Sequence, residues 1–137
     1  MRDVLTGTNN QALFDYSDQT VYEHQGLRFR SATEVKIYDE LVRRHLLVFP
    51  LPVAVLGNAG VYREPDFLVF SRNGNSGILE IHGEPFHPTK TTVKESARRR
   101  QFEDIGVNRC EVYDAAECYL STQRIVSDFL ARLKQGG

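Results

Sequence analysis

Apolar residues recur along the chain with helical spacing in some segments and with strand spacing in others, and the two kinds of segment alternate. Ser31, followed three residues later by Glu34, is a capping box that predicts a helix beginning at Ser31. Apolar positions share one side of this helix, namely Val35, Ile37, Tyr38, Leu41 and Val42. Beyond it the pattern predicts three strands, a helix, a strand and a last amphipathic helix, over residues 47–57, 65–71, 77–84, 91–105, 108–115 and 121–135.

Turn residues between these segments indicate how the strands are connected. Pro50 and Pro52 interrupt the first strand and predict that it lies at a sheet edge or begins with a bulge. The turn sequence NGNSG separates two short apolar runs and predicts a β-hairpin over residues 65–82. The order α-β-β-β-α-β-α therefore predicts an α/β protein whose mixed sheet carries helices on its faces.

Length and composition indicate one globular domain. The chain has 137 residues, of which 41% are hydrophobic and 26% are charged. Residues 1–25 have few periodic apolar positions and are expected to form an arm or an irregular extension, which leaves residues 26–137 as a single domain. No apolar run reaches the ~18 residues of a membrane span, and the first residues lack the apolar segment of a secretory signal. We therefore expect a cytoplasmic protein, in which Cys110 and Cys118 are buried reduced thiols because their spacing fits no zinc motif.

The predicted hairpin carries two carboxylates and a histidine within otherwise apolar strands. Asp66 stands at the start of the first strand, and Glu80 and His82 lie near the end of the second. Alternation places Glu80 and His82 on one face of their strand, with Leu79 and Ile81 on the other. Because the start of one strand lies beside the end of the other, Asp66, Glu80 and His82 are expected to converge at one end of the hairpin.

A cluster of carboxylates needs compensation for its charge. Glu34, in the first turn of the predicted helix, would join the cluster if that helix packs across the sheet. Like charges raise each other's pKa and resist simultaneous ionisation. A hard divalent cation removes that cost, and carboxylate oxygens suit Mg²⁺ or Mn²⁺ better than zinc.

Basic residues are concentrated in one segment although the net charge of −1 gives no indication of nucleic-acid binding. Residues 86–100 contain a single acid, Glu95. The basic residues of this segment are Lys90, Lys94, Arg98, Arg99 and Arg100. The first three of them are spaced four apart and would form one stripe of a helix, which is either a solvated face or a surface for nucleic-acid phosphates.

The acidic residues carry a resemblance to a known family. Glu34 on a helix, Asp66 after a proline on a strand, and Glu80 two residues before His82 on the next strand resemble the PD-(D/E)XK nuclease superfamily. More narrowly, the segments FRSATEVKIYDEL, REPDFLV and GILEIHGEPFHP look like small bacterial proteins of this superfamily related to the very short patch repair endonucleases. The resemblance implies a restriction-endonuclease-like αβββαβ core over residues 31–114, with the C-terminal helix outside it.

The resemblance also implies a function, that of an endonuclease that hydrolyses phosphodiester bonds in DNA with Mg²⁺ or Mn²⁺ as cofactor. Asp66, Glu80 and the backbone carbonyl of Ile81 would bind the metal, and Glu34 would complete its ligands or place a second ion. His82 stands where the family has a lysine, and it would accept a proton or orient the attacking water. The five basic residues would bind the DNA backbone, and further residues expected near the site or the DNA are Glu84, His87 and Gln101.

Other functions remain open. A nucleic-acid-binding or accessory protein that keeps the fold without turnover would explain both the replacement of the lysine by His82 and the weak net charge. A small metalloenzyme is a third reading, in which His82, Glu84 and His87 bind zinc or iron. Each of these residues also has a purely structural explanation: Glu34 can belong to a capping box, Asp66 can cap a turn, and His82 can occupy a core position. A single subunit offers one active site, so cutting both strands of a duplex needs a homodimer, a second partner or sequential nicks.

Overall fold

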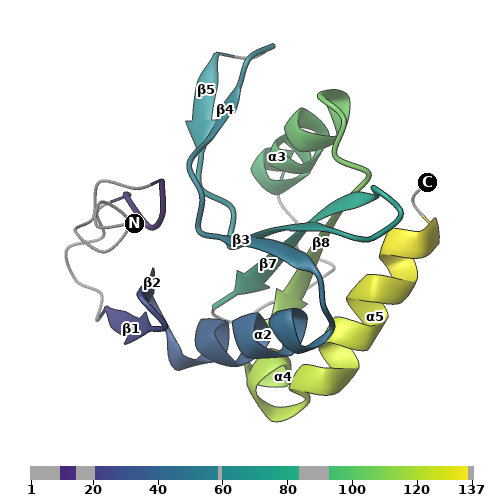
Figure 1. The fold of residues 1–137 in the computed structure, drawn as a ribbon. Coiled ribbons are helices and arrows are strands. Elements are labelled where there is room, and N and C mark those ends of the chain that lie inside the picture. The colour runs from purple at the N-terminus through teal and green to yellow at the C-terminus, as the bar shows by residue number, and fades with distance from the viewer. Residues whose placement is uncertain (1–9, 15–20, 59, 84–92, 136–137) are drawn as a thin grey trace.

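The computed structural model describes residues 10–14, 21–58, 60–83 and 93–135, and for residues 93–95 and 135 it describes the backbone alone. Within these residues the chain forms a mixed α/β structure around a four-stranded sheet with the strand order β3-β6-β7-β8 (Figure 1). β3 (Leu47–Pro50) and β6 (Phe67–Phe70) are antiparallel, as are β6 and β7 (Ser76–His82), whereas β8 (Arg109–Asp114) is parallel to β7. A parallel pair needs a crossover, and α3 (Val93–Asp104) lies between the two strands in sequence. The predicted mixed sheet, the predicted hairpin and the edge position of β3 are confirmed.

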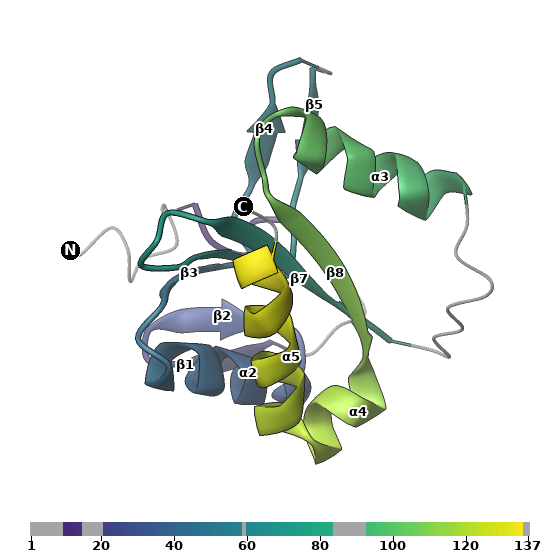
Figure 2. The ribbon, with the colours of Figure 1, turned by 90° about the vertical axis from the view of Figure 1, so that its right-hand side faces the viewer.

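Helices cover both faces of this sheet (Figure 2). α2 (Ala32–Arg43), α4 (Ala115–Leu120) and α5 (Thr122–Gln135) lie on one face and α3 on the other. The fully buried residues of the larger core, between the sheet and α2, α4 and α5, include Ile37, Leu41, Phe67, Val69, Leu79, Cys118, Val126 and Phe129. A smaller core under α3 consists of Leu56, Ile78, Phe102 and Cys110. Neighbouring residues Ile78 and Leu79 thus enter different cores, which confirms the alternation that was predicted for β7.

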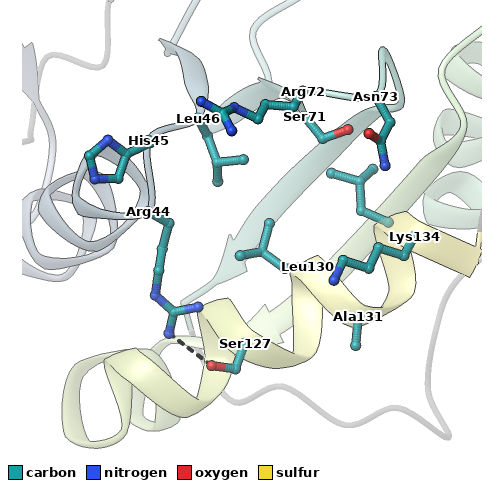
Figure 3. Close-up of a pocket in the computed structure, with 11 residues that line it drawn as sticks. Arg44, His45, Leu46, Ser71, Arg72, Asn73, Ser127, Leu130, Ala131 and Lys134 are labelled. Carbon is teal, nitrogen blue, oxygen red and sulfur yellow. Dashed lines mark hydrogen bonds between the residues drawn. The ribbon is translucent and has the colours of Figure 1, made fainter.

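Helix α5 is attached closely to both the sheet and α2. A Cβ atom placed on Gly77 of β7 would lie 2.9 Å from side-chain carbons of Leu133 and Phe129, so the absence of a side chain at this position allows the close packing. At the other side of the helix, Nη2 of Arg44 donates a hydrogen bond to Oγ of Ser127 at 2.8 Å (Figure 3). These contacts fix the C-terminal helix against the core.

The start of α2 matches the capping-box prediction with one change. Ser31 is the N-cap, and its Oγ accepts a hydrogen bond from the N–H of Glu34 at 3.1 Å. The carboxylate of Glu34 accepts from the N–H of Arg30 at 2.6 Å, one residue before the position that the capping box prescribes. The placement of Val42 on the apolar side is wrong, because it is 44% exposed. The helix turns by about 100° per residue, which carries Val42 away from the buried Leu41.

The single strand predicted over residues 47–57 is wrong in its extent. The chain leaves the sheet after β3 and forms a second strand, β4 (Ala54–Leu56), with Leu51 between them in the left-handed region at φ 47°. Pro52 lacks the N–H that a continuing strand would donate, which accounts for the break. β4 pairs with β5 (Val61–Arg63), a strand that the sequence did not predict, in a hairpin that extends beyond the main sheet in Figure 1.

A short helix and two thiols are the remaining features of the domain. Residues 115–120 form α4, which was not predicted and which begins where the Asp114 carboxylate accepts the N–H of Glu117 at 3.0 Å. Cys110 and Cys118 are buried and unbonded, as predicted, and burial raises the pKa of each thiol to about 12.

None of the helices in the described part of the chain is both long enough and apolar enough to cross a membrane.

The described parts of residues 1–25 lie against the domain. β1 (Tyr22–His24) pairs with β2 (Leu27–Phe29) in an antiparallel ribbon. Further upstream, the N–H of Ala12 donates to the carbonyl of Leu51 at 2.8 Å. The side chain of Asn10 exchanges two hydrogen bonds with the backbone of Val53, at 3.1 and 2.7 Å. Residues 10–14 contain no helix or strand and are attached to the loop that joins β3 to β4, whereas residues 22–24 of the predicted arm form the strand β1.

Candidate active site

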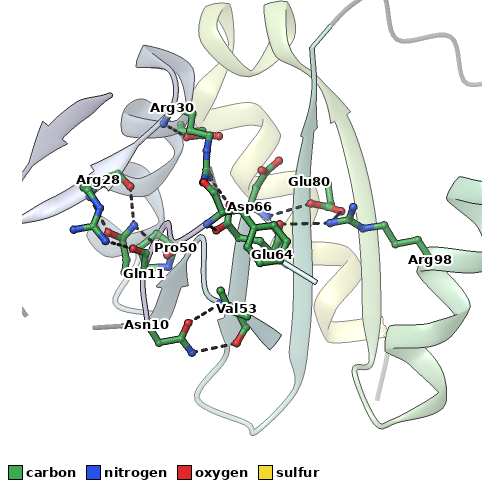
Figure 4. A network of polar contacts seen from close by, with 12 residues as sticks. Asn10, Gln11, Arg28, Arg30, Pro50, Val53, Glu64, Asp66, Glu80 and Arg98 are labelled. Carbon is green, nitrogen blue, oxygen red and sulfur yellow. Dashed lines mark hydrogen bonds and ion pairs between the residues drawn. The ribbon is translucent and has the colours of Figure 1, made fainter. Parts of the chain in front are cut away.

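Asp66 and Glu80 lie side by side where β6 begins and β7 ends (Figure 4). The register pairs Phe67 with Leu79, which makes the preceding Asp66 the neighbour of Glu80. The N–H of Asp66 donates to Oε2 of Glu80 at 3.1 Å, and the N–H of Ile81 donates to Oδ2 of Asp66 at 2.6 Å. The convergence of the two acids that the sequence predicted is therefore present, and it follows from the register of one hairpin.

The surroundings of Asp66 oppose its ionisation. Withdrawal of the carboxyl group from water raises its pKa well above the ordinary value of 3.8, and the carboxylates of Glu80 and Glu34 raise it further. The hydrogen bond from Ile81 and the guanidinium of Arg98 lower this pKa without cancelling the increase. Asp66 thus holds its proton more tightly than an exposed aspartate does, and a cation bound beside it would favour the charged form.

Glu34 and Asp66 line the same small pocket at the end of the sheet. The pocket has a volume of about 320 Å³, and among the described residues its ionisable lining consists of Arg30, Glu34, Glu64 and Asp66. Glu34 is 8% exposed, and burial is the main cause that raises its pKa. Glu64 also raises it, whereas the backbone and charge of Arg30 lower it. The predicted approach of the helix-borne Glu34 to the hairpin is confirmed, and three carboxyl groups of the described residues share this pocket with one guanidinium.

Arg98 connects α3 to the two acids. Its Nη2 lies 3.1 Å from Oε1 of Glu80 and 3.5 Å from the carbonyl oxygen of Glu64. The side chain of Arg98 is 38% exposed and that of Glu80 is 16% exposed, so the ion pair lies at the edge of the site. Arg98 was predicted only as a contact for DNA, and the structure adds this direct contact with a predicted metal ligand.

The sequence analysis missed an ion pair beside the site. Arg30 and Glu64 bind each other, and the side chain of Glu64 is almost fully buried. Both residues also bind the backbone of Phe14 in the N-terminal segment. The N–H of Phe14 donates to Oε2 of Glu64 at 2.9 Å, and the carbonyl oxygen of Phe14 accepts from Nη2 of Arg30 at 2.5 Å. The one signal for these two residues in the sequence is that each is close to a predicted site residue: Glu64 precedes the Pro65–Asp66 pair, and Arg30 precedes the N-cap Ser31.

The other predicted residues are distributed differently. His82 is half-buried at the end of β7, on the face that carries Glu80. Gln101 accepts a hydrogen bond from Arg63 at 3.1 Å, and so joins α3 to β5. Two predicted DNA contacts are exposed on α3, Arg99 and Arg100. Outside the described residues lie Glu84, His87, Lys90 and the side chain of Lys94.

The donor atoms at the site fit Mg²⁺ better than they fit zinc. Mg²⁺ is commonly bound through one or two carboxylates together with water and substrate phosphates, and Asp66 and Glu80 supply two carboxylates. Within residues 10–14, 21–58, 60–83 and 93–135, no three His, Cys, Asp or Glu side chains are grouped so that they could hold a metal ion. Two members of the alternative zinc or iron site, Glu84 and His87, lie outside those ranges.

The site thus consists of two adjacent acids on a hairpin, a buried glutamate on a neighbouring helix and an arginine from the opposite face of the sheet. Such an arrangement can bind a cation, a phosphate or both. No family model matches this chain, and comparisons with curated proteins and with solved structures find no match either.

Proposed function

We propose that this protein is a Mg²⁺-dependent nuclease that hydrolyses phosphodiester bonds in DNA. The observation that carries the proposal is the contact between Asp66 and Glu80 at the end of the hairpin. Burial raises the pKa of Asp66, and the neighbouring carboxylate of Glu80 raises it further, so the pair is costly to ionise. Carboxyl groups with strongly perturbed pKa values cluster at functional sites, and a cation bound beside this pair would offset the repulsion.

The order of elements supports a restriction-endonuclease-like core. α2, β3, β6, β7, α3 and β8 follow one another as αβββαβ when the β4–β5 hairpin is taken as an insertion. The family resemblance in the sequence coincides with this order, because Glu34 lies on α2, Asp66 directly precedes β6 and Glu80 lies on β7. In this proposal α5 is an addition that completes the core on the face opposite α3.

Each residue of the site has a chemical role in the proposal. A Mg²⁺ ion held by Asp66 and Glu80 would supply a Lewis acid for a phosphate oxygen and lower the pKa of a water molecule. Asp66 would hold the ion as a carboxylate, and because its pKa is raised, lowering the pH should weaken binding of the ion. His82, on the face of Glu80, accepts a proton from the attacking water or orients that water. Glu34 adds negative charge to the pocket from α2.

Arginines of α3 provide the proposed contact with DNA. A guanidinium binds phosphate oxygens through paired N–H groups, and Arg98 already extends to the edge of the carboxylate pair. Arg99 and Arg100 are exposed on the same helix and extend the positive surface. Binding through such groups weakens steeply with salt, because the logarithm of the affinity falls by about 0.9 per neutralised phosphate for each tenfold rise in salt concentration.

The experiment that tests this function is a cleavage assay on a panel of labelled DNAs. Single-stranded, duplex and mismatched DNA are incubated with the protein in Mg²⁺, in Mn²⁺ and in EDTA. We expect cleavage of at least one DNA with either metal and none with EDTA. Intact DNA under all these conditions would refute the nuclease function.

A nucleic-acid-binding protein without catalytic activity is the second candidate, and the Arg98–Glu80 ion pair favours it. The guanidinium gives Glu80 the positive partner that a metal ion would otherwise supply. In this case DNA binding persists in EDTA and no DNA is cleaved. Cleavage by a His82→Lys variant, but not by the parent, would identify a fold that is kept for binding.

A further inference from the structure

Figure 3 shows a second pocket beside the β6–β7 turn. In the register of the hairpin this turn is at the end opposite to Asp66 and Glu80. The walls of the pocket come from the C-terminal end of α2, the β6–β7 turn and α5, and its volume is about 1010 Å³. Pockets for small organic ligands commonly measure roughly 300–1,000 Å³, so a ligand of that size fits. Five residues of extended chain, about 16 Å, separate Asp66 from Ser71 at this pocket, which makes it distinct from the carboxylate site.

The ionisable lining of this pocket is entirely basic in the described part of the chain. It comprises Arg44, His45, Arg72 and Lys134, with no Asp or Glu among the lining residues. Arg44 shares its charge with Glu40, at 2.7 Å. Arg72 and Lys134 form no ion pair with any described carboxylate, and both are exposed. A protein with a net charge of −1 thus places two exposed cations, Arg72 and Lys134, at one cavity with no described carboxylate paired to them.

The rest of the lining is apolar, with a few hydrogen-bonding groups. Leu46, Leu130 and Ala131 offer carbon surface between the basic residues. Asn73 adds an amide that can both donate and accept. Ser71 also lines the pocket, and its Oγ is buried without a hydrogen-bond partner among the described residues, a cost that a ligand atom bonded to it would remove.

We propose that this pocket binds a phosphorylated nucleoside. The leucines supply a surface for a flat base, the amide of Asn73 can pair with polar atoms on the edge of the base, and Arg72 and Lys134 supply charge for phosphate oxygens. A purely apolar ligand would leave the cations unused, and free phosphate would leave the apolar surface unused. The nucleoside phosphate is either a free nucleotide or one unit of a DNA strand, and the test separates these two sources.

Calorimetry on the full chain in EDTA and low salt provides the test, with ADP, adenosine, inorganic phosphate and a short single-stranded oligonucleotide as separate probes. We expect ADP or the oligonucleotide to bind, and adenosine and phosphate to bind at least about tenfold more weakly, since each of them can use only one part of the pocket. ADP binding without competition from the oligonucleotide identifies a free nucleotide, and binding of the oligonucleotide alone identifies a strand. Adenosine that binds as tightly as ADP, or no binding by either phosphorylated probe, would overturn the proposal.

Variants locate the binding to this pocket. Ala131 is exposed, so Ala131→Glu adds a negative charge and bulk without removing a core side chain, and it should weaken binding of the phosphorylated probe by at least about tenfold. Lys134→Ala should weaken it by about tenfold, the effect expected for one charge-assisted hydrogen bond. Arg124→Ala, which removes an exposed arginine of the same helix outside the pocket, is the control and should leave the affinity unchanged. Equal affinities for all these proteins would show that the probe binds elsewhere.

Discussion

The guanidinium of Arg98 reaches from α3 to the carboxylate of Glu80, with 3.1 Å between Nη2 and Oε1. The same guanidinium lowers the pKa of Asp66, which is otherwise raised by burial and by its acidic neighbours. A helix that was expected only to contact DNA therefore also places a positive charge beside the two acids. Arg98 is one of several groups that set the pKa of Asp66, after burial, the carboxylates of Glu80 and Glu34 and the hydrogen bond from Ile81.

Replacing Arg98 by Ala should raise the pKa of Asp66 further. The substitution removes one of the two causes that lower this pKa and leaves the carboxylates of Glu80 and Glu34 in place. The pKa can be followed through the ¹³C shift of the Asp66 carboxyl group during a pH titration by NMR. Arg99→Ala, an exposed arginine at the next position, is the matched control and should leave the titration where it is in the parent. The same titration curve in Arg98→Ala as in the parent would contradict the role of the ion pair.

Asp66→Asn should stabilise the metal-free protein at neutral pH. An aspartate whose pKa is higher in the folded protein than in the unfolded chain binds more protons when folded. The stabilisation that Asp66 provides is therefore fully present below its unfolded-state pKa near 3.8 and is lost as the pH rises through its folded-state pKa. The amide of asparagine keeps an oxygen that can accept the N–H of Ile81.

Chemical denaturation in EDTA at pH 7 and at pH 3 measures this effect. We expect a larger free energy of unfolding for Asp66→Asn than for the parent at pH 7, and no such gain at pH 3, where the aspartate is protonated in both states. Asp104→Asn, at an exposed aspartate on α3, serves as control and should change little at either pH. A loss of stability at pH 7 would show that the charge of Asp66 supports the fold.

Gly77→Ala should destabilise the protein by about 1–3 kcal/mol, the usual cost of overpacking a core. The added methyl group would lie 2.9 Å from carbons of Leu133 and Phe129, so α5 or β7 must move. Gly57→Ala is the control, because no atom lies within 4 Å of the Cβ position there. Urea denaturation of the two variants measures the difference, and equal stabilities would mean that the packing of α5 on β7 is not tight.

His45→Gly should stabilise the protein by about 0.5–1 kcal/mol, because glycine adopts a left-handed backbone without the Cβ clash of other residues. His45 follows α2 with φ at 64°, and its N–H donates to the carbonyl of Val42 at 2.9 Å. His45→Ala keeps the Cβ atom and should leave the stability within about 0.5 kcal/mol of the parent. Thermal unfolding of the three proteins compares them, and equal effects of Gly and Ala would place the cause in the imidazole instead of the backbone.

Local patterns predicted the parts of the structure that rest on local physics. The hairpin follows from turn residues between two alternating runs, and its register then brings Asp66 to Glu80. The start of α2 follows from Ser31 and Glu34, whose hydrogen bonds span only a few residues. For these elements the information lies within one stretch of chain.

The features that escaped prediction depend on contacts between distant segments. The break after β3 accompanies a hydrogen bond from the N–H of Leu51 to the carbonyl of Asp66 and another from Ala12 to Leu51, both at 2.8 Å. The ion pair of Arg30 with Glu64 and the pairing of Arg98 with Glu80 each join segments that are more than 15 residues apart. Periodicity carries no information on such pairs, because a charged residue has the same appearance in the sequence whether it faces solvent or a buried partner.

The measurement that tests the central claim most directly compares the parent with Asp66→Asn in single-turnover cleavage of labelled DNA. Both proteins are assayed with the DNA that the panel identifies as substrate, at equal protein concentration in Mg²⁺, with Asp104→Asn as the control. We predict that the parent and Asp104→Asn cleave at similar rates and that Asp66→Asn is slower by at least about 100-fold, since a direct metal ligand should matter no less than the groups that support such ligands. Cleavage by Asp66→Asn at the rate of the parent would contradict the account.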